Sequence, residues 1–543
     1  MESSLELSGL KISTSKTKAV WFGSKCKSDE ILCPDLGLKW VHSFTLLGID
    51  FDSSLDLMNK NFEDKIDKVQ KMLSNWTYRY LTPFGKVTIV KSLGLSKISH
   101  IALVMPNPSK EMIKRIENTF YEFIWGDQKS EIVRCEDSKL PVKLGGLGVP
   151  DIAKFWTAFK FSWFRRMLNT ESFWPKLVLK NISSKLNYKI SSCDLLQLGA
   201  SKLVEISKTL KNPFWKQVLG SAIEVCQGAA FSFPEKIIDS PLFHNPLVVR
   251  NRVLKPTEFP EIPAITTLAN FFHPNTNNLM QWNDFCTRYN IQISEEKFID
   301  IRFSIKTAVQ KLKISLTKLN LAQSPQKPFL IDIVLSTNKG CSQYYKILTK
   351  KSTYSNKIHL REAKRHQELN ANFSLRFWDG SRQLYSSINF DNQLKWLQFQ
   401  TVRNSLQTNY VVSHFIANVS PTCSYCENPE SRELISHLFW FCPYVNAFLR
   451  EAFEFVCSTG LNYVPTRDQF LFGFHNLEFS CPKNYITLVL KKYIWLTKFK
   501  TRNLNMTGFK NLLKTYVCDI RFIFDVQNKP EKFSDWNAVL NSL

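Results

Sequence analysis

The sequence predicts a mainly helical protein with a small α+β region at its N-terminus, a helical bundle after it, and a small metal-stapled helical module towards its C-terminus. Three observations predict this fold class. Short apolar runs occur in residues 1–55, and amphipathic repeats of helical period begin at Met58. Residue types that bind metals cluster between Cys423 and Cys442. The apolar fraction of 44% lies in the globular range, so we expect packed cores.

Residues 1–55 are expected to hold short strands. "KAVWFG" (Lys18–Gly23) and "FTLLGIDFD" (Phe44–Asp52) are apolar runs bounded by polar or glycine-containing stretches, which is the pattern of strands. Asp50 and Asp52 alternate on the second run and would therefore share one face. They have no third acidic partner that the sequence identifies, so we assign no catalytic residue here.

Residues 56–170 are expected to form a helical bundle. The first helix carries an apolar stripe on one face, made of Phe62, Ile66, Val69, Leu73 and Trp76. Thr82 and Pro83 have the form of an N-cap followed by proline at the first helical position. A third helix is expected from Ser109 and a further one over Asp151–Leu168. The apolar faces of these helices predict core packing, and any function is expected on their basic faces.

Residues 171–385 are expected to form a less regular connector. Proline-bearing stretches such as Asn245–Ile265 are typical of loops. Before the connector, "KLGGLGVPD" (Lys143–Asp151) lacks both the G-x-G-x-x-G spacing and the preceding strand of a nucleotide-binding loop, so it predicts a turn. The metal-stapled module is expected over residues 386–460, and basic helices over 461–543.

The chain is strongly basic. It has 71 Lys and Arg against 47 Asp and Glu, a net formal charge of +24. Such an excess favours a polyanionic partner, either nucleic acid or an acidic membrane surface. A solvated basic surface without a partner is the alternative. The sequence has no secretory h-region and no run of about 18 apolar residues, so we expect RNA or DNA, an intracellular location and no membrane. No small-molecule substrate is evident, and protein partners stay unknown.

Basic residues interleaved with aromatic residues indicate where nucleic acid would bind. Between Lys339 and Arg365 eight basic residues accompany one acidic residue, with tyrosines among them. Basic groups neutralise phosphates, and aromatic faces stack on bases. A second basic segment, Asn484–Asn503, is expected to be an amphipathic helix. Outside residues 1–55, the candidate nucleic-acid-binding residues are Lys68, Lys71, Arg79, Lys86, Lys346, Lys350, Lys351, Arg361, Lys364, Arg365, Lys491 and Lys492. For each of them a solvated surface position is the alternative.

A metal site is predicted from the C-x2-C-x10-H-x4-C spacing of Cys423, Cys426, His437 and Cys442. Two cysteines at this spacing can direct both sulfurs at one ion. Three thiolates and one imidazole complete a tetrahedron, which suits zinc and leaves no open position. The predicted role is therefore structural, since the binding energy stabilises a small fold. The alternative is four residues that merely lie near one another, with His437 bound to a backbone carbonyl.

The second half of this site poses a geometric problem. On an ideal α-helix, positions five apart differ in direction by about 140°. His437 and Cys442 therefore cannot both face one ion from an undisturbed helix. Because the residue before a proline is displaced from helical angles, Pro443 predicts a solution. We expect the helix that carries His437 to end near Phe441, Cys442 to lie in the break, and Pro443 to begin the next helix.

Motifs of catalysis are absent from the sequence. Polymerases and nucleases hold divalent ions with acidic residues, and no Asp-Asp pair occurs in the chain. The P-loop, H-E-x-x-H and G-x-S-x-G motifs are absent too. The residues alone thus predict a basic, mostly helical nucleic-acid-binding protein with a structural zinc ion.

Several stretches, in their order along the chain, resemble the reverse transcriptases of LINE-type, non-LTR retrotransposons. Ser8–Gly23 is similar to the segment that follows the catalytic Asp-Asp motif late in the palm, and Phe44–Asp52 is similar to the primer grip. Lys65–Ser92 is similar to the thumb, and Phe120–Ile152 is similar to the segment after the thumb, with Gly145-Gly146-Leu147 as its typical triplet. Trp396–Cys426 together with Ser436–Cys442 is similar to the zinc-binding module. The resemblance covers the middle, about 170–340, poorly.

The resemblance implies names for the regions and a role for one lysine. Residues 1–55 would be a palm remnant, 56–170 a thumb-like bundle, 171–385 a wrist-like connector and 386–460 the zinc-binding module. Lys16 matches the late-palm lysine that in related polymerases assists proton transfer to pyrophosphate, and we add it to the nucleic-acid-binding candidates. The family usually has Asn in place of Ser13 and often an aromatic residue in place of Leu46.

The resemblance also implies that the catalytic aspartates of the family stand before the position where this chain begins. We therefore expect the chain to bind RNA or DNA, in the nucleus or cytoplasm as a ribonucleoprotein, but not to polymerise alone. Magnesium is expected only if an active palm is supplied. Two alternatives stay open: part of an active RNA-directed DNA polymerase whose N-terminal half is supplied separately, and a domesticated protein whose zinc module binds other proteins.

Overall fold

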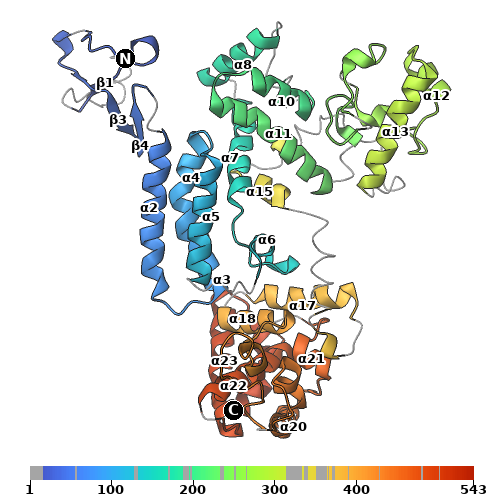
Figure 1. Ribbon diagram of the computed structural model, residues 1–543. Coiled ribbons are helices and arrows are strands. Elements are labelled where there is room, and N and C mark those ends of the chain that lie inside the picture. The colour runs from blue at the N-terminus through green and yellow to red at the C-terminus, as the bar shows by residue number, and fades with distance from the viewer. Residues whose placement is uncertain are drawn as a thin grey trace. The chain divides into compact units, whose positions relative to one another are not determined.

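A computed structural model shows a mainly helical chain with two small sheets near the N-terminus (Figure 1). Its contacts divide it into two compact units. Unit 1 consists of Met1–Trp76, Val90–Phe120 and Pro150–Lys351, and unit 2 consists of Thr77–Ile89, Tyr121–Val149 and Ser352–Leu543. The structure describes residues 16–32, 34–54, 58–126, 133–168, 172–186, 195, 198–232, 238–249, 252–264, 266–312, 333–335, 340–349, 364, 366–369, 373–388, 391–426, 428–477, 481–500 and 502–543.

The two sheets belong to unit 1 and have two strands each. β1 (Lys18–Ala19) pairs in parallel with β2 (Lys39–Trp40), and β3 (Ser43–Leu46) pairs antiparallel with β4 (Ile49–Asp52). The turn between β3 and β4, Leu47-Gly48, has positive φ at both residues, as a two-residue turn of type I′ requires. Short strands near the N-terminus are confirmed, but only Lys18–Ala19 of the first predicted run is a strand, and the second run, Phe44–Asp52, is a hairpin of two strands.

Three helices follow the sheets and stand side by side: α2 (Met58–Thr77), α4 (Leu95–Val104) and α5 (Lys110–Trp125) (Figure 1). Nη2 of Arg115 on α5 donates to Oδ1 of Asp67 on α2 at 2.7 Å. The predicted apolar stripes are buried, as seen at Phe62, Ile66, Val69, Leu73, Ile116, Phe120 and Phe123. Helical periodicity therefore identified the faces that pack in the core.

A single helical run, Pro83–Val104, contains α3 (Pro83–Ile89), a π-helical turn (Val90–Gly94) and α4. Oγ1 of Thr82 accepts the N–H of Gly85 at 3.3 Å, so the predicted N-cap is confirmed. By length and composition alone this run would be able to cross a membrane. That is weak evidence, because the core helix of a soluble protein passes the same test.

The rest of unit 1 contains two further cores. The first is formed by α7 (Ile152–Met167), α8 (Phe173–Leu186), α10 (Ala200–Thr209), α11 (Pro213–Ser232) and α15 (Ser342–Thr349). The second surrounds α12 (Trp282–Tyr289) and α13 (Glu295–Lys311) and includes apolar residues from the preceding loops. Lys160 of α7 is fully buried, and its ammonium donates to the carbonyl of Ala102 at 2.6 Å, at the end of α4. From the irregular stretch predicted over Asn245–Ile265, the side chains of Val248, Leu254, Phe259 and Ile262 pack in the second core.

Unit 2 is built around one central helix. Its helices in Ser352–Leu543 are α17 (Leu375–Ser387), α18 (Asn392–Val402), α19 (Asn409–Val412), α20 (Pro443–Ser458), α21 (Arg467–Phe472), α22 (Pro482–Lys500), α23 (Met506–Val526) and α24 (Asn537–Asn541). The central helix, α22, is buried on nearly every side. It contacts both α18 and α23. The metal-ligand residues lie in the same unit.

The glycine-rich turn of unit 2, within Lys143–Asp151, requires glycine for steric reasons. It follows the short helix α6 (Cys135–Ser138). A Cβ at Gly146 would lie 2.1 Å from the carbonyl oxygen of Leu140, which no side chain tolerates. The carbonyl of the adjacent Gly145 accepts a hydrogen bond from the buried Arg403 at 2.7 Å. This stretch is therefore a packed turn, as its spacing predicts.

Candidate metal centre

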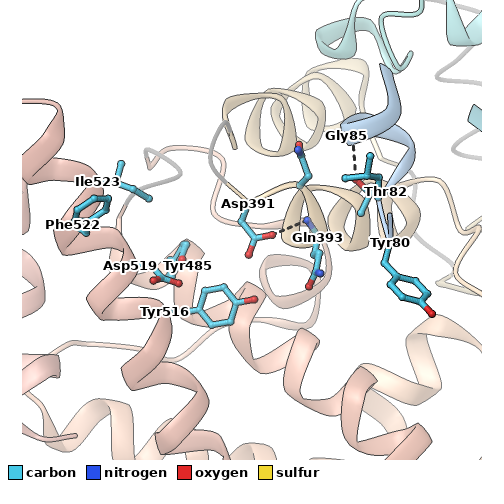
Figure 2. A pocket seen from close by; sticks show the side chains of 12 residues that line it. Tyr80, Thr82, Gly85, Asp391, Gln393, Tyr485, Tyr516, Asp519, Phe522 and Ile523 are labelled. Carbon is cyan, nitrogen blue, oxygen red and sulfur yellow. Dashed lines mark hydrogen bonds between the residues drawn. The ribbon is translucent and has the colours of Figure 1, made fainter. Parts of the chain in front are cut away.

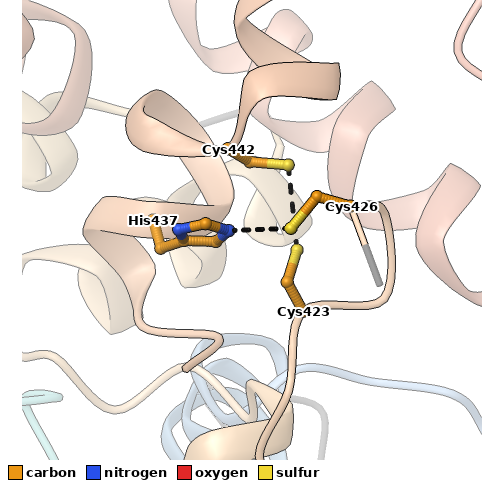
Figure 3. Close-up of side chains that lie close together, drawn as sticks. All are labelled: Cys423, Cys426, His437 and Cys442. Atoms are coloured by element: carbon orange, nitrogen blue, oxygen red, sulfur yellow. Dashed lines mark hydrogen bonds between the residues drawn. The ribbon is translucent and has the colours of Figure 1, made fainter. Parts of the chain in front are cut away.

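The first two ligands lie on a tight loop that begins with a short antiparallel contact. Thr422 and Arg432 form an isolated bridge, and the N–H of Cys423 donates to the carbonyl of Ser431 at 3.0 Å. The N–H of Tyr425 then donates to Sγ of Cys423 at 3.4 Å. This loop brings Sγ of Cys423 and Sγ of Cys426 to the same side (Figure 3).

The other two ligands come from a π-helical turn and the break after it. The turn covers His437–Phe441, and the N–H of Cys442 donates to the carbonyl of His437 at 2.8 Å. Such an i→i+5 bond closes a wider turn than an α-helix has, so residues five apart lie nearly above one another. Cys442 has extended backbone, and Pro443 is the first residue of α20. The predicted break is confirmed, whereas the π-helical turn was not predicted.

The four ligand atoms have the spacing of a tetrahedral site. Sγ of Cys423 and Sγ of Cys442 are 3.8 Å apart, and Sγ of Cys426 lies 3.5 Å from Nε2 of His437. All four atoms lie within 4.8 Å of one another. A tetrahedral zinc ion with Zn–S of about 2.3 Å and Zn–N of about 2.0–2.1 Å sets these edges to roughly 3.8 and 3.6 Å. The four side chains point towards one another (Figure 3) and can hold one metal ion.

The electrostatics of the cluster favour a cation. The contact with Cys442, followed by burial, raises the pKa of Cys423 to about 12. The same contact lowers the pKa of Cys442. Sulfurs this close resist ionising together, and a bound cation removes that cost because it stabilises thiolates directly. In the described part of the chain, this is the one group of three or more His, Cys, Asp or Glu side chains that gathers with the spacing of metal ligands.

A buried carboxylate, Glu433, ties the metal loop to the rest of unit 2. Its Oε2 accepts the N–H of Ser424 at 2.9 Å and the hydroxyl of the same residue at 2.8 Å. Its Oε1 accepts the N–H of Asn409 at 2.8 Å and a hydrogen bond from Nζ of Lys498 on α22. The side chains of Glu433 and Lys498 are 0% and 3% exposed. The hydroxyl of Tyr425 adds a second link, because it donates to the carbonyl of Ile494 at 2.6 Å.

Sequence reasoning missed Glu433. Nothing in "PESRELISH" separates this glutamate from the exposed glutamate three positions before it. Its partner, Lys498, lies 65 positions away along the chain. The sequence predicts a basic amphipathic helix over Asn484–Asn503, which implies surface positions for its lysines.

Two candidate nucleic-acid-binding residues are not on the surface. Lys491 is 0% exposed, and its ammonium donates to the carbonyl of Leu471 at 3.0 Å and to the side chain of Gln398. Burial lowers the pKa of Lys491 to about 7. Lys492 donates to Oε1 of Gln393 at 2.6 Å. Neither ammonium is available to a phosphate, so we remove both from the candidate surface. The long apolar stems of these lysines pack against neighbouring side chains, which explains how a helix that is buried on nearly every side accommodates them.

The remaining candidates are scattered over both units. The exposed ones are Lys16, Lys68, Lys71 and Lys346 in unit 1, and Arg79 and Lys364 in unit 2. Lys86 is half-buried, and its ammonium donates to the carbonyl of Ile124 at 3.2 Å. Lys350, Lys351, Arg361 and Arg365 lie outside the described residues. Lys68 and Lys71 lie one turn apart on α2, and the other exposed candidates come from separate segments. The role of all of them in binding stays a prediction.

A different basic and aromatic surface lies at the C-terminal end of α22. We call it the α22-end surface and define it as Tyr444, Phe499, Lys500, Arg502 and Asn503. Phe499 is 64% exposed, and both basic side chains are exposed. The hydroxyl of Tyr444 lies 3.4 Å from Oδ1 of Asn503, which connects the start of α20 to the end of α22. The preceding residue is Lys498, so this surface adjoins the link to the metal loop. The stretch "KFKTRN" (Lys498–Asn503) is visibly basic in the sequence, but only the structure shows that Lys498 is buried and Lys500 is exposed.

Asp50 and Asp52 share a face of β4, as predicted, and have local partners. The hydroxyl of Thr45 donates to Oδ1 of Asp50 at 2.5 Å, and that of Ser54 donates to Oδ2 of Asp52 at 2.6 Å. Among the described residues neither joins a group with the spacing of metal ligands. These contacts account for both side chains as parts of the hairpin.

No family model matches the sequence, and no curated protein gives a significant match.

Proposed function

We propose that the chain binds RNA or DNA as a protein of the non-LTR retrotransposon reverse-transcriptase type, and that a structural zinc ion holds its C-terminal module together. The zinc ligands in this proposal are Cys423, Cys426, His437 and Cys442. Three sulfurs and one imidazole suit zinc and fill all four positions, so the ion would be structural and not catalytic. The order of the sequence resemblances supports the family.

The observation that carries the nucleic-acid part is the α22-end surface on a chain of net charge +24. Lys500 and Arg502 would neutralise phosphates, and the exposed ring of Phe499 would stack on a base. Stacking requires an unpaired base, so this combination favours single-stranded RNA or DNA. The metal centre would act indirectly, because Glu433 and Lys498 fix the end of α22 against the metal loop.

No polymerase chemistry is assigned to this chain. Nucleotide transfer needs carboxylates that hold magnesium against phosphates. The chain has no Asp-Asp pair. The one candidate pair, Asp50 and Asp52, has hydroxyl partners instead. Lys16 is exposed and would act only beside a palm that carries the missing carboxylates. Magnesium therefore enters the proposal only with such a palm.

The test is the salt dependence of binding to a fluorescein-labelled 20-nucleotide single-stranded RNA, measured by fluorescence anisotropy with the zinc-loaded full chain. Each phosphate contact contributes about 0.7 to the slope of log K against log salt for a single strand. The double substitution Lys500→Gln and Arg502→Gln should therefore weaken binding and lower the slope by about 1.4. Phe499→Ala should weaken binding by about 1–3 kcal/mol and leave the slope unchanged.

A matched control removes the same charge from the segment that follows the C-terminal end of α23. Lys529→Gln with Lys532→Gln changes the net charge equally, and α23 has 21 residues, a length of roughly 30 Å. The proposal predicts a clearly smaller effect for this control. Equal effects of the two double variants would mean that only overall charge matters. Salt-insensitive or absent RNA binding would refute the nucleic-acid proposal.

A further inference from the structure

Unit 2 contains a cavity that the metal centre and the α22-end surface do not use. It has a volume of about 410 Å³ and lies between the segment that leads into α3 and the helices α18, α22 and α23 (Figure 2). This volume is within the range of about 300–1,000 Å³ typical of ligand sites. The lining includes three tyrosines and two aspartates, and it includes no lysine, arginine or histidine. On a chain with a large basic excess, this composition is unusual.

One of the two carboxylates is balanced by its surroundings. Oδ1 of Asp391 caps α18, because it accepts the N–H groups of Gln393 and Leu394 at 2.7 and 2.9 Å. Nζ of the buried Lys492 lies 4.0 Å from Oδ2 of Asp391 and also donates to the hydroxyl of Tyr516, a lining residue. This carboxylate therefore stabilises the fold and contributes little free charge.

The other carboxylate, Asp519 on α23, is exposed and faces the cavity. Among the described residues it has no ion-pair partner. Burial first, and then the charge of Asp391, raises the pKa of both Tyr485 and Tyr516, and Asp519 adds to each increase. The phenols therefore stay protonated and uncharged, and Asp519 supplies the unbalanced negative charge of the lining.

Two of the aromatic side chains that line this cavity are exposed to solvent. Tyr80 is fully exposed and Phe522 is 68% exposed, and both belong to the lining. Each exposed ring offers apolar area and a polarised face to a ligand in the cavity. A ring face attracts a cation, and a carboxylate beside it strengthens the attraction. The rings also offer apolar area for the aliphatic stem of a long side chain.

We propose that this cavity binds the guanidinium or ammonium group of an arginine or lysine side chain presented by a protein segment. Asp519 would pair with the cation, and Tyr80 and Phe522 would pack against its stem. An anionic ligand does not fit, since the lining offers two carboxylates and no basic side chain. The inference is independent of the proposed zinc and nucleic-acid functions, because none of their residues lines the cavity.

The test uses the zinc-loaded full chain and the peptide acetyl-Gly-Arg-Gly-amide, titrated by saturation-transfer NMR. The matched ligand is acetyl-Gly-citrulline-Gly-amide, which has nearly the same shape and no charge. Because Asp519 is exposed, solvent screens its ion pair with the ligand, and Asp519→Asn should raise Kd by about two- to fivefold. Asp525→Asn removes the same charge from an exposed position on the same helix outside the lining and should leave Kd unchanged.

The outcomes separate the possible ligands. Binding of the arginine peptide that Asp519→Asn weakens, without binding of the citrulline peptide, supports the proposal. Spermidine that displaces the peptide at lower concentration also supports the cation site and assigns a free polyamine as its source. Equal binding of both peptides, no effect of Asp519→Asn, or binding of guanosine in place of the arginine peptide would overturn it. Because no readout involves RNA or zinc, failure here is distinct from failure of the proposed function.

Discussion

Replacement of Glu433 by glutamine should open the metal loop locally. The carboxylate accepts hydrogen bonds from the N–H groups of Asn409 and Ser424, from the Ser424 hydroxyl and from the ammonium of Lys498. A glutamine keeps one acceptor oxygen and places an NH2 group against the remaining donors. Lys498, which is 3% exposed, would then be a buried charge without a counter-charge.

The magnitude follows from this burial. Breaking a buried ion pair by removing one partner costs about 3–5 kcal/mol. Since each 1.4 kcal/mol is a factor of ten, amide protection in the loop should fall by a factor of about 100 or more. Lys498→Met leaves Glu433 buried and should have a similar effect. The double variant should lose less than the sum of the single losses, because the two side chains act as one pair.

The assay is hydrogen–deuterium exchange by mass spectrometry on the zinc-loaded full chain, read at peptides that contain Asn409 and Ser424. Arg450→Met, an exposed site on α20, is the control for loss of a basic side chain and should leave these peptides unchanged. Unchanged protection in Glu433→Gln, or strictly additive effects in the double variant, would refute the reasoning that this pair holds the loop.

Three further outcomes are expected. Cys423→Ser removes one of the three sulfurs, so the purified chain should retain less zinc and the metal loop should lose protection, while unit 1 stays folded by circular dichroism and exchange. Gly146→Ala places a Cβ 2.1 Å from the carbonyl of Leu140 and should lower the melting temperature of unit 2, whereas Gly220→Ala, with no atom within 4 Å, should not lower that of unit 1. Burial lowers the pKa of Lys491 from 10.5 to about 7, so the unfolded chain binds more protons than the folded chain between these values. Unit 2 should therefore gain stability as pH rises through this window, and urea unfolding of Lys491→Met should show a weaker gain.

Local patterns predicted the helices after Met58 and the gathering of the four candidate metal ligands. An apolar stripe such as Phe62, Ile66 and Val69 depends only on helical period, and these side chains are buried. The metal ligands are close in sequence, so their spacing and Pro443 were sufficient to predict the break at Cys442. The residues that determine each of these features lie within 19 positions of one another along the chain.

Features that depend on distant partners were not predicted. The period of α22 suggests a basic face, but neighbours on all sides bury Lys491 and Lys498. Glu433 gains its role only from a lysine 65 positions away. The core around α12 and α13 is built largely from loop residues without periodicity, so the sequence offered no pattern for it. The cavity beside Asp519 likewise needs four segments of unit 2.

The most direct measurement on the metal centre is metal analysis of the purified full chain, combined with X-ray absorption at the zinc edge. The four-ligand site predicts one zinc ion per chain, with three sulfur ligands at about 2.3 Å and one nitrogen ligand at about 2.0–2.1 Å. A folded chain without zinc, or a zinc ion with fewer than three sulfur ligands, would contradict it.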